Sequence, residues 1–210
     1  MKFASTLALA GFACMLIAGA AFGVTIISKP PDQGPYWNPV GNEPTYVYAD
    51  CFIAPGGSDL TVTQLGTWLQ PIYETPHAIV RFEIWGSLGG GPDCNNVIAA
   101  TATFTTEAGG LNLYTLPVAT GGGPLVTGVK YFFVITGFGL GNANYGMYQV
   151  GGHTQNSVYQ DNCTFWYSNE LDGCTFLGQN LTPEMAFEVT LSGTTAVEPL
   201  AISRVKALYR

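Results

Sequence analysis

The sequence predicts an all-β protein in which two antiparallel sheets pack as a jelly-roll-like sandwich of about nine strands. From Tyr46 onward, short apolar or alternating runs recur about every 8 to 15 residues. Clusters of Gly and Pro such as APGG, SLGGGPD and ATGGGP separate these runs, as turns separate strands. Residues 45–193 show no pattern that is typical of an amphipathic helix. Strand and turn signals in regular succession therefore indicate the fold class.

Three segments give the clearest strand patterns. In AIVRFEIW, residues 78–85, Val80, Phe82 and Ile84 share one face, while Arg81 and Glu83 share the other. The segment MAFEVTL, residues 185–191, alternates in the same way. KYFFVIT, residues 130–136, is apolar on both faces and predicts a central strand covered on both sides. Further strands are expected at 46–53, 60–69, 97–105, 111–118, 145–150 and 163–167.

Residues 1–23 have the features of a secretory signal peptide. A single Lys2 precedes an apolar stretch from Phe3 to Ala21, and small residues stand at Ala21 and Gly23. Cleavage after Gly23, or after Ala20 or Ala21, leaves a mature chain of about 187 residues, which is the length of one all-β domain. We therefore expect a secreted protein that works outside the cell, at the cell surface or in the periplasm.

The rest of the chain divides into three parts. Residues 24–44 are expected to form a leading arm, because five prolines between Lys29 and Pro44 oppose regular strand pairing. Residues 45–193 are expected to form the sandwich domain. The tail, 194–210, carries three basic residues among its last seven, Arg204, Lys206 and Arg210. Pro199 could open a short docking helix in this tail, and a mobile terminus is the alternative.

The charge of the body excludes some partners. Residues 24–193 contain three basic and 13 acidic side chains, which is a formal charge of −10. Such a surface repels phosphate backbones, so we expect no nucleic-acid partner. No apolar segment after the signal reaches the roughly 18–20 residues of a transmembrane helix, so none is expected in the mature chain.

Four cysteines remain after the signal peptide and are expected to form disulfides, as is usual in secreted proteins. They permit three pairings, of which we favour Cys51 with Cys94 and Cys163 with Cys174, because the second pair encloses a hairpin-sized loop. A zinc site would require the C-x₂₋₄-C pairs that the sequence lacks.

The densest mixture of aromatic and polar residues runs from Tyr145 to Gly178. Aromatic rings stack on the apolar faces of sugars, and amide groups exchange hydrogen bonds with sugar hydroxyls. The same residue types also fill sandwich cores and build turns. The residues expected to bind a glycan are Tyr148, Tyr159, Trp166, Tyr167 and Asn169.

The same stretch contains the oxygen ligands that calcium prefers. The candidate ligands are Asp161, Asn162, Glu170 and Asp172, although no D-x-D-x-D-G loop is present and solvated turns would have the same composition. Calcium is the one cofactor that the sequence suggests.

Catalysis has little support in the sequence. The two histidines, His77 and His153, lie in no catalytic motif, and we expect no catalytic residues. A glycoside hydrolase would need two carboxylates that meet in space. The available acids are Glu83, Glu170, Asp172 and Glu188, of which Glu83 and Glu188 are expected on polar strand faces where a concave sheet could hold a substrate.

Residues 45–193 resemble secreted bacterial β-sandwich proteins of the choice-of-anchor domain type. The segments that carry the resemblance are YVYADCFIAP, VKYFFVITGFGL and LTPEMAFEVTLSG. The resemblance implies export and attachment to the cell surface, and it implies no catalytic residues. The Pro-Glu-Pro signal and apolar helix that usually follow such a domain are absent after Gly193.

These observations lead to the expectation of a secreted, non-catalytic module that binds glycan or another cell-surface component, including a surface protein. A structural subunit of an extracellular coat or fibre is the alternative, because Gly-rich loops and exposed sheet edges suit assembly. A secreted glycoside hydrolase is the third candidate.

Overall fold

The structure is a computed structural model, and it describes residues 23–29, 31, 33–40, 47–71, 79–107, 109–136, 148–153, 165–168, 177–179 and 184–195. Within these ranges the chain forms strands and turns and no helix, so the all-β class is confirmed. It follows that this part of the chain contains no helix that could span a membrane. The strands are β1 (Gly23–Lys29), β2 (Gln33–Val40), β3 (Val47–Ile53), β4 (Gly57–Pro71), β5 (Ile79–Leu88), β6 (Gly91–Thr101), β7 (Phe104–Thr105), β8 (Asn112–Gly121), β9 (Lys130–Thr136), β10 (Tyr148–His153), β11 (Phe165–Ser168), β12 (Leu177–Gln179), β13 (Glu184–Met185) and β14 (Phe187–Thr195).

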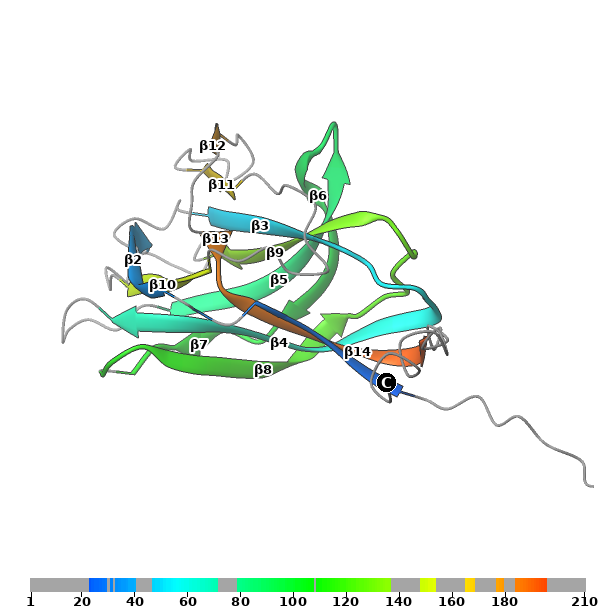
Figure 1. Ribbon diagram of the computed structural model, residues 1–210, viewed down its shortest axis with the longest axis horizontal. Coiled ribbons are helices and arrows are strands. Elements are labelled where there is room, and N and C mark those ends of the chain that lie inside the picture. Colours follow the sequence, from blue (N-terminus) through cyan, green and yellow to red (C-terminus); the bar gives the residue numbers. More distant parts are fainter. Residues whose placement is uncertain are drawn as a thin grey trace, which may run out of the picture.

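The strands form one curled antiparallel sheet whose two halves face each other (Figure 1). Its order is β1-β14-β4-β8-β6-β5-β9-β3-β11-β12, with β10, β13, β2 and β7 paired off this path. In Figure 1, β4, β8 and β14 form the lower layer and β3, β9 and β5 lie above them. The sequence predicted two separate sheets with about nine strands in total. The described ranges instead contain fourteen strands, and β8 joins the two layers into one sheet.

The two layers join where β8 pairs with β4 on one side and with β6 on the other. Gly121 makes this junction possible, because its φ is 75° and an added Cβ would lie 2.2 Å from the carbonyl oxygen of Ile98. Only glycine tolerates both the left-handed backbone and the close approach. Near this junction the hydroxyl of Thr101 on β6 accepts a hydrogen bond from the backbone N–H of Phe82 on β5 at 3.1 Å. It donates one to the carbonyl of Ala102 at 2.9 Å.

The main core lies between the two layers. The alternation predicted for 78–85 is confirmed on its apolar face, because Val80, Phe82 and Ile84 are at most 1% exposed. Stacked and tilted rings link β5, β9, β14 and β3 across this interior. The core includes Leu60, Val62, Leu65 and Leu69 of β4, Tyr131, Phe133 and Ile135 of β9, Met185 of β13, and Phe187, Val189 and Leu191 of β14.

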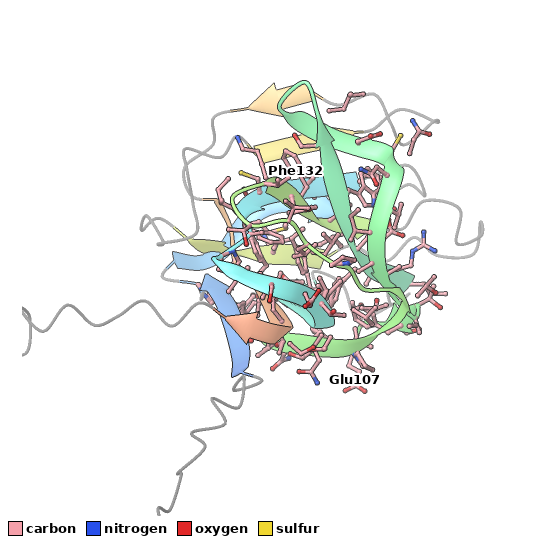
Figure 2. The ribbon with its side chains drawn as sticks, turned by 90° about the vertical axis from the view of Figure 1, so that its right-hand side faces the viewer. Glu107 and Phe132 are labelled. Carbon is pink, nitrogen blue, oxygen red and sulfur yellow. The ribbon has the colours of Figure 1, made fainter. Side chains whose placement is uncertain are left out.

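Strand β9 coincides with the predicted central strand and is covered on both faces. Its residues Phe132 and Val134 point away from the main core and are 1% and 0% exposed. They belong to a second group of buried residues, which we call the outer cluster: Val47, Ala49, Cys51, Trp85, Phe132 and Val134. Figure 2 shows Phe132 among side chains in the interior and Glu107 at the periphery.

The expectation of an unpaired leading arm at 24–44 is wrong. Strand β1 pairs with β14, and β2 pairs with β10 although it contains Pro35 and Pro39. The β2 ladder is interrupted by register shifts between Tyr148 and Val150 and between Gly151 and Gly152. An irregular ladder accommodates residues without an N–H, which explains why the prolines do not prevent pairing.

The β5–β6 hairpin closes with a two-residue turn. Gly89 and Gly90 have φ values of 60° and 91°, as a type I′ turn requires at both central positions. The preceding residue, Leu88, is 71% exposed. The hairpin therefore extends an exposed tip beyond the packed layers, as Figure 1 shows for β6.

Candidate functional site

Strands β5, β9 and β3 place three rows of residues on the face of the sheet that points away from the main core. Read from β5 through β9 to β3, the rows are Arg81–Thr136–Val47, Glu83–Val134–Ala49 and Trp85–Phe132–Cys51. Every residue of these rows except Arg81 is buried. This outer face is therefore a second packed surface, and it contains a polar network.

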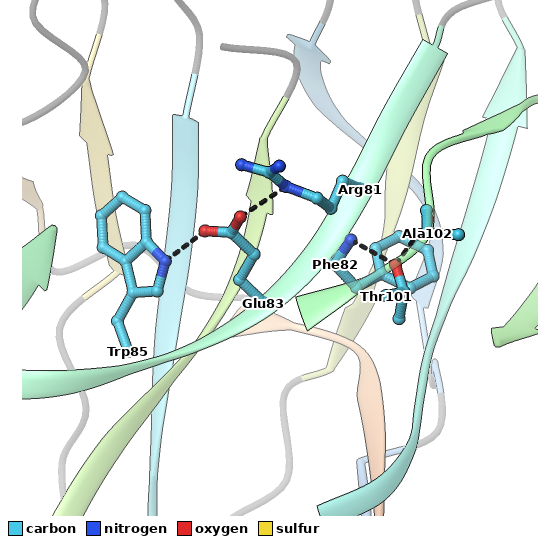
Figure 3. A network of polar contacts seen from close by, with 6 residues as sticks. All are labelled: Arg81, Phe82, Glu83, Trp85, Thr101 and Ala102. Atoms are coloured by element: carbon cyan, nitrogen blue, oxygen red, sulfur yellow. Dashed lines mark hydrogen bonds and ion pairs between the residues drawn. The ribbon is translucent and has the colours of Figure 1, made fainter. Parts of the chain in front are cut away.

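The network is centred on the carboxylate of Glu83 (Figure 3). Nε of Arg81 lies 2.5 Å from Oε1 of Glu83, and the side chains are 35% and 3% exposed. The indole N–H of Trp85 donates to Oε2 of the same carboxylate. Arg81, Glu83 and Trp85 are two residues apart on one strand and so share a face. Both oxygens of Glu83 are thus engaged inside the protein.

The prediction that Glu83 faces a substrate across an open concave sheet is therefore wrong. The alternation correctly separated Glu83 from the main core, but the opposite face of β5 is also buried. The sequence signal that could have revealed this is Trp85, which lies on the same face and is 5% exposed. A large aromatic residue among polar ones indicates a covered face.

Asp50 is a second buried acid, and sequence reasoning did not single it out. It is 0% exposed and lies on β3. Its Oδ1 accepts the backbone N–H of Cys51 at 2.7 Å, and its Oδ2 accepts the backbone N–H of Met185 at 3.0 Å. Charge-assisted bonds to backbone donors are among the stronger hydrogen bonds in proteins. Asp50 therefore ties β3 to β13 and has a structural role.

Glu83 and Glu188 do not form a pair of acids. Glu188 is half-buried on β14, where it alternates with the core residues Phe187 and Val189. It therefore lies on the outer face of the layer that contains β14, and Glu83 lies on the outer face of the opposite layer. The two other predicted acids, Glu170 and Asp172, lie outside the described residues.

The structure places three of the predicted glycan-binding residues in strands. Tyr148 begins β10, where it is the register partner of Pro71 of β4. Trp166 and Tyr167 lie in β11, opposite Ala49 and Tyr48 of β3. The backbone of Trp166 thus continues the row of Glu83, Val134 and Ala49. The other two predicted residues, Tyr159 and Asn169, lie outside the described residues.

The calcium prediction lies wholly outside the part of the chain that the structure describes. Asp161, Asn162, Glu170 and Asp172 all belong to segments without a description. The described residues themselves contain no group of three or more His, Cys, Asp or Glu side chains that could hold a metal ion. The calcium site stays a prediction.

Two of the four predicted disulfide cysteines are described. Cys51 is 1% exposed in the outer cluster, and Cys94 of β6 packs against this cluster. Neither is a free thiol. Cys163 and Cys174 lie outside the described residues, so the predicted pairing stays a prediction.

Comparisons with known proteins gave no match. No protein-family model matches the chain, and no curated protein is similar to it.

Proposed function

We propose that this protein is a secreted, non-catalytic module that binds glycan or another component of the cell surface. The observation that carries the proposal is the position of Trp166 and Tyr167 in β11. This strand lies beyond β3 near the end of the sheet path, and among the described strands only the three-residue β12 is further out. Aromatic rings are the groups that stack on sugars, and two consecutive aromatic residues stand here near the end of the sheet path.

The contacts of Glu83 and the position of Glu188 support a binding role over hydrolysis. A glycosidase needs two carboxyl groups about 5–10 Å apart on either side of the scissile bond. Glu83 is engaged at both oxygens by Arg81 and Trp85, and Glu188 lies on the outer face of the other layer. Hydrolysis would therefore have to use acids other than this pair.

The sequence and the described cysteines support the extracellular location. The signal-like residues 1–23 and the even number of cysteines after them are typical of exported proteins. We propose that these four cysteines form two disulfides, and the absence of a free thiol at Cys51 and Cys94 supports this. The resemblance to choice-of-anchor proteins points to the same compartment.

The binding proposal predicts that Trp166→Ala and Tyr167→Ala, made singly and together, abolish retention on a glycan array. Circular dichroism of each variant checks that the fold is intact, so that a loss of retention reports a lost ligand contact and not unfolding. The array is read with calcium and again with EDTA. Loss of binding in EDTA assigns a calcium-assisted site around Asp161–Asp172, and unchanged binding assigns stacking alone.

Leu88→Ala is the matched control for this experiment. Leu88 is 71% exposed at the hairpin tip, so its removal should change neither retention nor the melting temperature. Retention that survives the double change at Trp166 and Tyr167 would count against the proposed site. Absence of binding to every glycan by the unchanged protein would count against a glycan as the ligand.

A structural subunit of an extracellular coat or fibre is the second candidate, and one observation favours it. The sheet path ends in β1 and β12, and within the described ranges each of these strands is paired on one side only. Unpaired strand edges present donors and acceptors that another chain can pair with. If the protein is such a subunit, sedimentation velocity over a concentration series should show growing assemblies. A single monomer boundary at the highest concentration would contradict it.

A further inference from the structure

Strand β1 is attached to the rest of the sheet by a single ladder. Seven residues, Gly23 to Lys29, pair with β14 from Gly193 to Phe187 without a register shift. In the described part of the chain β14 is the only strand with which β1 pairs, and β14 continues to β4 on its other side. The first strand is thus an outermost strand with a regular, uninterrupted partner.

Strand β1 contributes to the main core, so its removal would destabilise the fold. Ile27 is 0% exposed and belongs to the main core, and its register partner Val189 is also 0% exposed. Removing β1 would expose Val189 to water and leave the backbone edge of β14 without hydrogen-bond partners. Any strand that occupies this position restores both interactions, whichever copy of the chain supplies it.

The connection that follows β1 is short and rich in proline. Residues 30–32 read Pro-Pro-Asp and lead to β2, which pairs with β10 instead of returning to β14. Proline fixes φ near −65° and disfavours compact conformations of the residue before it. A short connection between an outermost strand and the body favours exchange of that strand between copies.

We propose that β1 is an exchangeable strand whose partner is a second copy of this chain, so that β1 of one copy pairs with β14 of the next. Reciprocal exchange closes a dimer with two-fold symmetry, and one-way exchange builds an open chain. The ladder and the core contact of Ile27 are the same in the exchanged and unexchanged forms. The proposal does not depend on glycan binding, and it supplies a mechanism for the coat or fibre candidate.

The test mixes two single variants, Ser28→Cys and Glu188→Cys, whose positions are register partners in the β1–β14 ladder. Directly opposed residues in antiparallel strands have Cα atoms about 4.5–5.5 Å apart, which suits a disulfide. After incubation and mild oxidation, non-reducing electrophoresis and intact mass measure the covalent heterodimer. The mixture of Ser28→Cys with Glu107→Cys is the matched control, because Glu107 is an exposed acid at the periphery (Figure 2).

Exchange predicts a heterodimer yield several-fold above that of the control mixture. Equal yields in the two mixtures would overturn the proposal. The double variant Ser28→Cys with Glu188→Cys provides a second measurement. At low concentration it should form the bond within one chain, after which the locked protein should no longer form larger species. Failure to form that bond would contradict the β1–β14 register and with it the proposal. Glycan retention is measured separately, so its loss or survival does not affect this result.

Discussion

Phe133→Ala should lower the free energy of unfolding by about 3–5 kcal/mol, the usual range for removing a fully buried Phe. Phe133 is 0% exposed in the main core. Its ring stacks on Phe187 with centroids 4.9 Å apart and planes at 10°, and it contacts Phe82 with centroids 5.6 Å apart. Because Phe187 lies on β14 and Phe82 on β5, Phe133 connects the two facing layers.

The loss is large because the cavity cannot close easily. The surrounding rings belong to paired strands, whose backbones are fixed by their ladders. Urea unfolding followed by circular dichroism, with the disulfides kept oxidised, measures the effect. Phe133→Leu retains most of the apolar volume and should lose less. The exposed control Leu88→Ala should stay within about 0.5 kcal/mol. A loss at Phe133 as small as that of the control would contradict the packing of the two layers through this ring.

Glu83→Ala should lower the free energy of unfolding by about 2–4 kcal/mol. The change removes the acceptor of the buried Trp85 indole and the charge partner of Arg81. Removing one member of a buried ion pair costs about 3–5 kcal/mol when the other stays buried. The Arg81 side chain is 35% exposed and can turn toward water, which places the expected loss lower.

Companion variants separate the contributions to this loss. Glu83→Gln keeps a hydrogen-bond acceptor for Trp85 and removes the charge, so it should lose less than Glu83→Ala. Trp85→Phe removes the donor together with part of the ring volume, so its loss combines the broken hydrogen bond with a small cavity. The double change Arg81→Met with Glu83→Leu should recover part of the loss, because apolar residues can replace a buried pair. Glu107→Ala, at an exposed acid, is the control and should have little effect. A Glu83→Ala protein as stable as this control would contradict the buried network.

The order of the strands along the chain could be predicted because local alternation reports burial directly. Strand β9 coincides with the apolar segment 130–136, and β3 and β5 begin within one residue of the predicted starts. Alternation separates one face of a strand from the other, so the side chains of the main core were also predictable. It does not report what covers the second face. The sequence for this reason placed Glu83 in an open site, whereas the structure buries it with Trp85.

The sequence by itself determined the all-β class, the position of most strands and the inward-facing residues, because these depend on neighbours two residues apart. Only the tertiary structure decided which strands meet. It joined both layers into one sheet through β8, paired β1 with β14 and β2 with β10, and aligned β11 with β3. These contacts bring together residues far apart in the chain, and in β2 the two prolines Pro35 and Pro39 also obscure the strand pattern. The outer cluster exists for the same reason, since its residues come from β3, β5 and β9, which no local period connects.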